Sequence, residues 1–92
     1  MSEPTARYRR HPDIRLTSLE DEGVVLHLGE RRYFTVNETG LVLLEALKLP
    51  RTFDDLVAAL VQEYEVTEGK AAETTREFLD HCLKAAVVQE TD

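Results

Sequence analysis

The chain has 92 residues, 18 of them acidic and 11 basic, with one cysteine and a formal net charge of −7 at pH 7. This length corresponds to one domain with a modest core. A single cysteine excludes an internal disulfide, and no Cys or His pair has the spacing of a metal site. The acidic balance disfavours a partner held mainly through phosphates, so nucleic-acid binding is not expected.

No apolar run approaches the roughly 18 residues that a membrane span needs. The amino terminus contains Glu3 and several arginines and lacks the apolar block of a signal peptide. These features predict a cytoplasmic protein without a membrane partner, and nothing in the sequence calls for a cofactor.

The chain divides into a flexible arm at residues 1–12, one domain at 13–88 and a short tail at 89–92. The arm is polar except for Ala6 and Tyr8 and ends in His11-Pro12. Residues 13–19 alternate between apolar and polar side chains, which predicts a first, half-buried strand. A turn is expected at residues 20–23.

Residues 23–28 and 31–36 read as a second and a third strand, separated by Gly29-Glu30. Glycine in first position favours a two-residue type II′ hairpin, in which Leu28 faces Arg31. This register predicts a core face made of Val24, Leu26, Leu28, Tyr33 and Thr35. The other face is more apolar than a fully solvated one, so partial cover is expected over Val25, His27, Arg32, Phe34 and Val36.

Three helices are expected to follow. Asn37 can cap the first, in which leucines recur at helical spacing until Pro50. Thr52 and Asp55 form a capping-box-like pair before a strong stripe at Phe53, Leu56, Val57, Leu60, Val61 and Tyr64. The third helix starts near residue 68 after Thr67, runs to about residue 86, and carries the stripe Thr75, Phe78, Leu79, Cys82, Leu83 and Ala86. Val87 and Val88 are expected to close the core.

The predicted fold is therefore an α+β domain, in which a three-stranded antiparallel meander precedes three α-helices. The third strand keeps one unpaired edge, and its segment from Tyr33 to Val36 has no charge to block pairing. An extended peptide could pair there, but its backbone hydrogen bonds contribute only about 0.5 to 1.5 kcal/mol each. Useful affinity also needs apolar side chains in a groove, for which the third helix is the natural second wall.

The run from Arg32 to Gly40, Arg-Tyr-Phe-Thr-Val-Asn-Glu-Thr-Gly, resembles the "tyrosine, x, x, aliphatic, Asn, x, Thr, Gly" segment of the PqqD-like family. This family comprises peptide-binding chaperones of pyrroloquinoline quinone biosynthesis and the related recognition elements for ribosomally made, modified peptides. The resemblance continues through residues 51–56, 63–66 and 78–79, and covers roughly residues 13–88.

The resemblance implies a winged-helix-like domain without chemistry of its own, which binds the leader segment of a precursor peptide as a fourth strand. The strand wall of the site would be Arg31, Arg32, Tyr33, Phe34, Thr35 and Val36. The helix wall, chosen from helical spacing, would be Ala72, Thr75, Arg76, Leu79, Asp80 and Leu83. Implied partners are the precursor peptide and its maturation enzyme, a protease, cyclase or radical enzyme, in a lasso-peptide or quinone-cofactor pathway.

Two positions depart from the family pattern. The family usually has glycine after the first helix, where this chain has Leu49, and before the closing aliphatic pair, where it has Ala86. Alanine resists the left-handed conformation of a helix C-cap, so the third helix is expected to end differently or to run on.

Several alternatives stay open at this point. Phe34 and Val36 could be plain core, and Arg31 and Arg32 could be an ordinary edge guard. The whole chain could instead be a winged helix that binds DNA through its third helix, or an adaptor that dimerises through the same edge. Catalysis is disfavoured, because consecutive helical side chains such as those of His81 and Cys82 diverge by about 100°.

Overall fold

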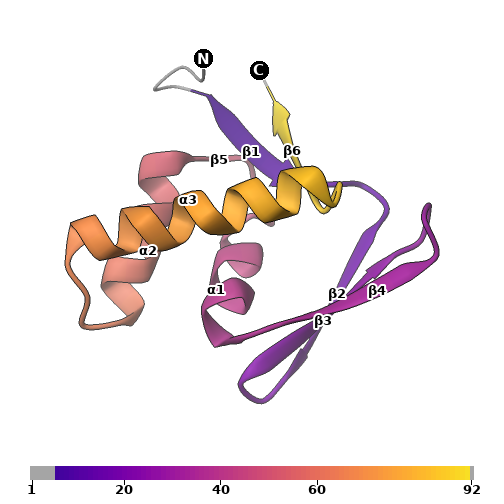
Figure 1. Cartoon of the computed structure of the whole chain (residues 1–92), viewed down its shortest axis with the longest axis horizontal. Helices are drawn as coiled ribbons and strands as arrows, with labels where there is room; N and C mark the ends of the chain where they lie inside the picture. The colour runs from indigo at the N-terminus through magenta and orange to yellow at the C-terminus, as the bar shows by residue number, and fades with distance from the viewer. Residues whose placement is uncertain (1–5, 92) are drawn as a thin grey trace.

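The computed structural model describes residues 6–91. Its elements, in chain order, are β1 (Arg7–Arg10), β2 (Ile14–Leu19), β3 (Glu22–His27), β4 (Arg32–Val36), α1 (Glu38–Ala46), β5 (Arg51–Thr52), α2 (Phe53–Glu63), α3 (Glu68–Lys84) and β6 (Val88–Thr91). The predicted α+β fold, with a meander followed by three helices, is confirmed. Figure 1 shows α1 between the meander and α2, with α3 lying in front of the two helices.

The meander has strand order β2-β3-β4, and both strand pairs are antiparallel. His27 pairs with Arg32, which is the predicted register. The predicted type II′ turn is wrong, since no described glycine has a positive φ and the left-handed residue of the loop is Arg31, at φ 55°. The loop spans residues 28–31, and loops of this length are usually built around a type I turn.

The predicted core face of the meander is wrong. Val25 is 1% exposed and Phe34 is half-buried, whereas Tyr33, on the face predicted to be buried, is 73% exposed. Both faces carry apolar side chains, so the alternation alone could not say which one the helices would cover. The helices pack on the Val25 face, where the fully buried leucines of α1 complete the core, with Leu43 and Leu44 at 0% exposure.

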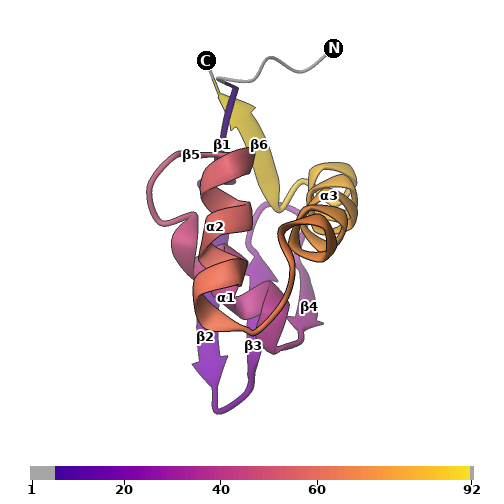
Figure 2. The ribbon, with the colours of Figure 1, turned by 90° about the vertical axis from the view of Figure 1, so that its left-hand side faces the viewer.

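A second sheet, of order β5-β1-β6, corrects the predicted arm and tail. Residues Arg7 to Arg10 pair with Val88 to Thr91, and Tyr8, 7% exposed, joins the core. Figure 2 shows β6 running beside β1 from the end of α3. This pairing joins the two ends of the described chain through backbone groups, so the local sequence pattern does not reveal it. Residues 1–5 and 92, the rest of the predicted arm and tail, lie outside the described residues.

The three predicted helix N-caps are confirmed. The Asn37 side chain accepts a hydrogen bond from the Gly40 amide, and Thr67 accepts one from the Lys70 amide. Thr52 and Asp55 form a reciprocal capping box at 3.0 and 3.1 Å. Each pair satisfies backbone donors that the first turn of a helix leaves free, so the helix starts are locally encoded.

The end of α3 differs from the expectation drawn from alanine. Ala86 adopts the left-handed conformation itself, at φ 60°, and α3 ends at Lys84. The amides of Ala86 and Val87 donate to the carbonyls of Leu83 and Cys82, at 3.2 and 2.9 Å, which is the Schellman pattern. The chain then turns sharply, and it buries Val87 and Val88, as expected, at 5% and 2% exposure. At the other departure from the family pattern, α1 ends at Ala46 and its C-cap Leu47 has φ −83°, so Leu49 replaces no left-handed residue.

None of the helices within residues 6–91 combines the length and the apolar character that crossing a membrane requires.

Candidate functional site

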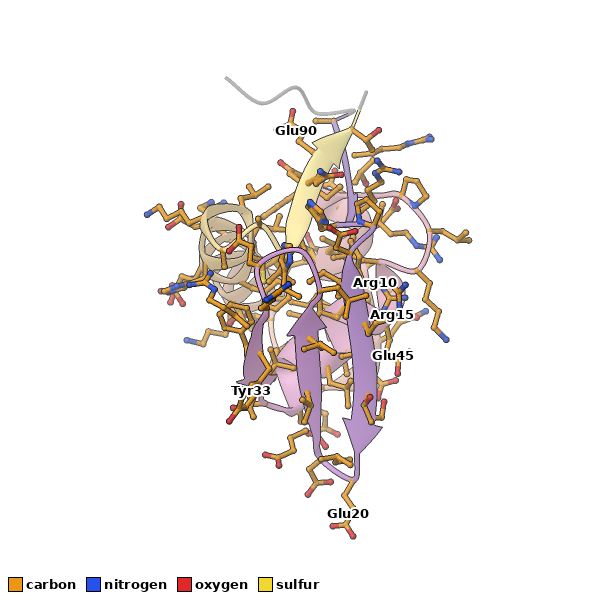
Figure 3. The ribbon with its side chains drawn as sticks, turned by 90° about the vertical axis from the view of Figure 1, so that its right-hand side faces the viewer. Arg10, Arg15, Glu20, Tyr33, Glu45 and Glu90 are labelled. Carbon is orange, nitrogen blue, oxygen red and sulfur yellow. The ribbon has the colours of Figure 1, made fainter. Side chains whose placement is uncertain are left out.

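The free edge of β4 is the first component of the site. Within residues 6–91, β4 pairs with β3 alone, so its other edge presents unpaired backbone groups. The predicted open rim along Tyr33 to Val36 is therefore present, and no charged side chain lies along it. Figure 3 views the outer face of the meander and shows Tyr33 at the β4 side.

An apolar hollow of about 350 Å³ lies between β4 and the C-terminal half of α3, and apolar atoms form most of its lining. Three consecutive β4 residues contribute to one wall, and buried core side chains form the floor. Its lining residues are Val25, Phe34, Thr35, Val36, Phe78, His81, Cys82, Ala85 and Val87. A strand added to β4 could therefore place side chains in this hollow.

The helix wall of the hollow follows helical spacing. Phe78, His81, Cys82 and Ala85 stand at i, i+3, i+4 and i+7, so they share one face of α3. The Schellman turn after Ala85 then folds Val87 back beneath this face. Phe78 and Cys82 belong to the stripe that the sequence predicts, but His81 and Ala85 were not predicted as wall residues.

Most of the predicted helix wall lies elsewhere. Thr75 and Leu79 are core, at 0% and 5% exposure, and the Arg76 guanidinium lies 5.4 Å from the centre of the Phe53 ring of α2. The other three predicted wall residues, none of which lines the apolar hollow, are Ala72, Asp80 and Leu83. The face of α3 that was predicted as the wall points toward α2 in the structure. Helical periodicity marks the most apolar stripe of a helix, and that stripe usually packs into the core.

The predicted strand wall divides between two faces. Phe34 and Val36 lie on the inner face and line the hollow, which Thr35 borders from between them. Tyr33 projects from the outer face of the sheet. The Arg32 guanidinium lies 5.1 Å from the centre of the Phe34 ring and pairs with Glu30 at 3.2 Å. Arg31 lies in the hairpin loop.

The hollow continues into a more polar one of about 430 Å³ beyond the end of β4. The two share Phe78 and His81, so they adjoin along α3, and together they are called the groove below. The polar part is lined by Asn37, Thr39, Gly40, Thr74, Glu77, Phe78, Asp80 and His81. Asp80, a predicted wall residue, thus borders this polar part, and its carboxylate pairs with Lys84 at 3.1 Å.

The side chains of the groove offer little reactive chemistry. Burial raises the pKa of the Cys82 thiol to about 12, so very little of the nucleophilic thiolate exists near neutral pH. Among residues 6–91, no group of three His, Cys, Asp or Glu side chains could hold a metal ion. What the groove does offer is apolar surface beside free backbone hydrogen-bonding groups.

Comparison with known proteins adds two findings. The family model described as coenzyme PQQ synthesis protein D (PqqD) matches residues 22–88. The chain is also similar to a solved structure titled "TbiB1 in Complex with the TbiA(beta) Leader Peptide", with 22% sequence identity and a TM-score of 0.80. That match covers 88% of this chain and 94% of the other, and it shows that the two share a fold. No curated protein sequence matches the chain.

Proposed function

The chain belongs to the PqqD family, and from this premise we propose that it is a non-catalytic module that binds the leader segment of a ribosomally made precursor peptide. The leader pairs with the free edge of β4 and inserts apolar side chains between β4 and α3. The resulting complex presents the precursor to a maturation enzyme.

The observation that carries the proposal is the open β4 edge beside an apolar hollow. Backbone pairing along Tyr33 to Val36 supplies a few hydrogen bonds of about 0.5 to 1.5 kcal/mol each. Burying apolar side chains adds roughly 25 cal/mol per Å² of apolar surface. Together these contributions can exceed the cost of ordering a peptide, which edge pairing alone would not do.

The similar solved structure supports this assignment, because its title names a leader peptide in the complex. For the present chain, the proposed contact residues are Phe34, Thr35 and Val36 of β4, together with Phe78, His81 and Cys82 of α3 and its C-cap Ala85. This set replaces the helix wall that spacing alone predicted.

Catalysis by such a module is indirect. Holding the precursor beside the enzyme raises the effective concentration of the reacting segment, with no bond made or broken by the module itself. The high pKa of Cys82 is consistent with this role, because the one thiol in the groove stays protonated near neutral pH.

The charges of α3 favour a peptide over DNA. Lys70 and Lys84 are paired with Glu73 and Asp80, at 3.5 and 3.1 Å, on the helix that would have to enter a DNA groove. A helix whose lysines already face carboxylates contributes little to phosphate binding.

The test is a titration of the chain with the fluorescently labelled leader of the precursor peptide encoded nearest to its own gene. We expect saturable binding at micromolar concentration or below, with slower amide exchange along β4 in the complex. A parallel titration with mixed duplex DNA at low salt should give no binding. DNA binding that weakens steeply as salt rises, with no leader binding, would replace the proposal with the winged-helix alternative.

A further inference from the structure

Tyr33 is a large aromatic side chain that does not line the groove. It is 73% exposed, and it lies on the outer face of the strand whose free edge is proposed to bind a peptide. Its cross-strand neighbour Leu26 is 41% exposed and pairs in turn with Arg15 of β2. The row Arg15, Leu26, Tyr33 therefore ends at the open edge, with apolar surface still uncovered.

The neighbouring row has the same layout on the other face. Leu16 pairs with Val25, and Val25 pairs with Phe34, which lines the hollow. A fourth strand would extend both rows by one position each, because side chains alternate between the faces of a sheet with a period of two. The residue that extends the Phe34 row enters the groove, and the adjacent residue extends the Tyr33 row.

We propose that the bound peptide is read on both faces of the sheet and that Tyr33 selects an aromatic or aliphatic side chain next to the groove anchor. This inference rests on the proposed function and specifies its ligand. Residues opposite Phe34 and Val36 are apolar and fill the hollow, and the residue opposite Tyr33 is large and covers its ring. In either strand direction, the position opposite Tyr33 adjoins the position opposite Phe34.

The expected size of the effect follows from cross-strand pairs in sheets. A cross-strand pair of two large apolar side chains on one face should raise the binding affinity about two- to fivefold relative to a pair of small side chains. The groove anchor contributes more, because it leaves water almost completely. Selection at the Tyr33 position is therefore weaker than selection at the two groove positions, but it remains measurable.

The experiment uses a displayed library of random nine-residue peptides, selected in parallel on four forms of the full chain. These are the wild type, Tyr33→Thr, Leu19→Thr and Phe34→Asp. Leu19 is the matched control, because it is also an exposed apolar residue on the outer face, 47% exposed, but lies on the opposite edge strand. Threonine suits a strand, so neither Thr variant should unfold the sheet.

Wild type and Leu19→Thr should both enrich peptides with apolar residues at i and i+2 and a large apolar residue at the flanking i−1 or i+3. Tyr33→Thr should keep the first two preferences and lose the flanking one. A synthetic peptide from the wild-type pool should bind Tyr33→Thr about two- to fivefold more weakly. Replacing its flanking residue by threonine should remove that difference.

The two levels of the proposal fail in different ways. If Tyr33→Thr selects the same flanking residue as the wild type, two-sided reading is wrong and the groove function stands. If the wild type enriches no pattern beyond that of Phe34→Asp, peptide binding between β4 and α3 is itself wrong.

Discussion

The two edges of the meander differ in how their backbone is protected. Along β2, Arg15 Nη1 donates hydrogen bonds to the carbonyl oxygens of Pro12 and Ile14, at 3.2 and 3.1 Å. Ser18 Oγ, further along β2, donates to the Glu45 carboxylate at 3.1 Å. Figure 3 shows Arg15 and Glu45 at the β2 edge of the sheet, with Tyr33 at the opposite edge. Charge thus guards β2, in the way that natural edge strands usually avoid pairing.

Along β4 the residues that the structure describes provide no comparable guard. Tyr33 to Val36 carry no charge, and Arg32 turns its guanidinium toward Glu30 and the Phe34 ring. An apolar hollow borders this edge. The two backbone edges of the sheet therefore differ in the side chains around them, and the β4 edge is the one left open to pairing. Four sets of measurements, given in order of expected effect, test this contrast.

The largest expected effect concerns the reactivity of Cys82, the thiol that lines the β4 side. With a pKa of about 12, Cys82 has far less thiolate near neutral pH than an exposed cysteine. The thiolate that does form is more nucleophilic because it is more basic, but this offsets only part of the loss in reaction rate. Alkylation by iodoacetamide at pH 8 should be at least about thirtyfold slower than for an exposed thiol. The rate should still rise about tenfold per pH unit from pH 9 to pH 10, where an ordinary thiol begins to level off.

The matched control for this measurement is a double variant, Cys82→Ala with Thr17→Cys, which moves the thiol to the exposed β2 edge. Bound leader should slow alkylation of Cys82 and leave the Cys introduced at position 17 unaffected. Equal slowing at both positions would mean that the peptide does not distinguish the two edges.

The second effect is on leader affinity. Phe34→Asp places a charge in the hollow and should weaken leader binding at least tenfold, which corresponds to about 1.4 kcal/mol. Thr17→Asp places the same charge at the β2 edge and should change affinity less than twofold. Both affinities are measured by fluorescence anisotropy.

Phe34 is half-buried, so a variant on the exposed rim of the opposite wall separates binding from folding. His81→Asp provides this second change, and it should also weaken binding while circular dichroism stays unchanged. Full affinity in folded forms of both variants would contradict the assignment of the groove.

The third effect is on stability alone. Thr52→Ala removes the side-chain half of the capping box of α2, away from both edges, and should lower the free energy of unfolding by about 1 kcal/mol. Hydrogen bonds with Thr52, first from its backbone and then from its side chain, lower the pKa of Asp55. The stabilisation of the folded state by the ionised Asp55 carboxylate is therefore complete above pH about 4, and it is lost as the pH falls through the lowered pKa.

Urea unfolding at pH 7 and at pH 2.5 checks this prediction, and the cost of Thr52→Ala should be smaller at pH 2.5. Leader affinity at pH 7 should equal that of the wild type. A loss of affinity here would indicate that general stability, rather than the open edge, governs binding.

The smallest effect concerns the turn that completes the floor of the hollow. Ala86→Gly relieves a left-handed alanine and should raise the free energy of unfolding by about 0.5 to 1 kcal/mol, measured by urea unfolding. Ala72→Gly, in the interior of α3, should lower the free energy of unfolding by a similar amount. If both changes destabilise the protein, the strain assigned to Ala86 is wrong.

Features that depend on near neighbours in the chain were predicted well from sequence. The caps at Asn37, Thr52 and Thr67 form where they were expected, because each side chain bonds an amide three residues ahead. The register His27 to Arg32 was also correct, because a short loop leaves few ways to pair two strands.

The candidate site was predicted only in part. The open rim of β4 followed from strand order, and Phe34, Thr35 and Val36 do line the groove. On the opposite wall, the predicted Thr75 and Leu79 lie in the core and do not line the hollow, because the periodic stripe from which they were chosen packs largely inward. Ala85 continues the helical spacing of Phe78 and Cys82, but His81 is polar and two apolar stripes compete on this helix, so only the packing of α3 against the sheet could identify this face.

Sequence patterns were enough to predict the order of meander and helices, the helix starts, the strand register and the uncharged rim from Tyr33 to Val36. Long-range packing was needed to fix which face of the meander is buried, which side of α3 faces the rim, and that the two ends of the described chain form a second sheet. The division is physical. Caps and hairpins are settled by hydrogen bonds over a few residues, whereas the choice between two apolar faces depends on the summed burial of segments far apart in the chain.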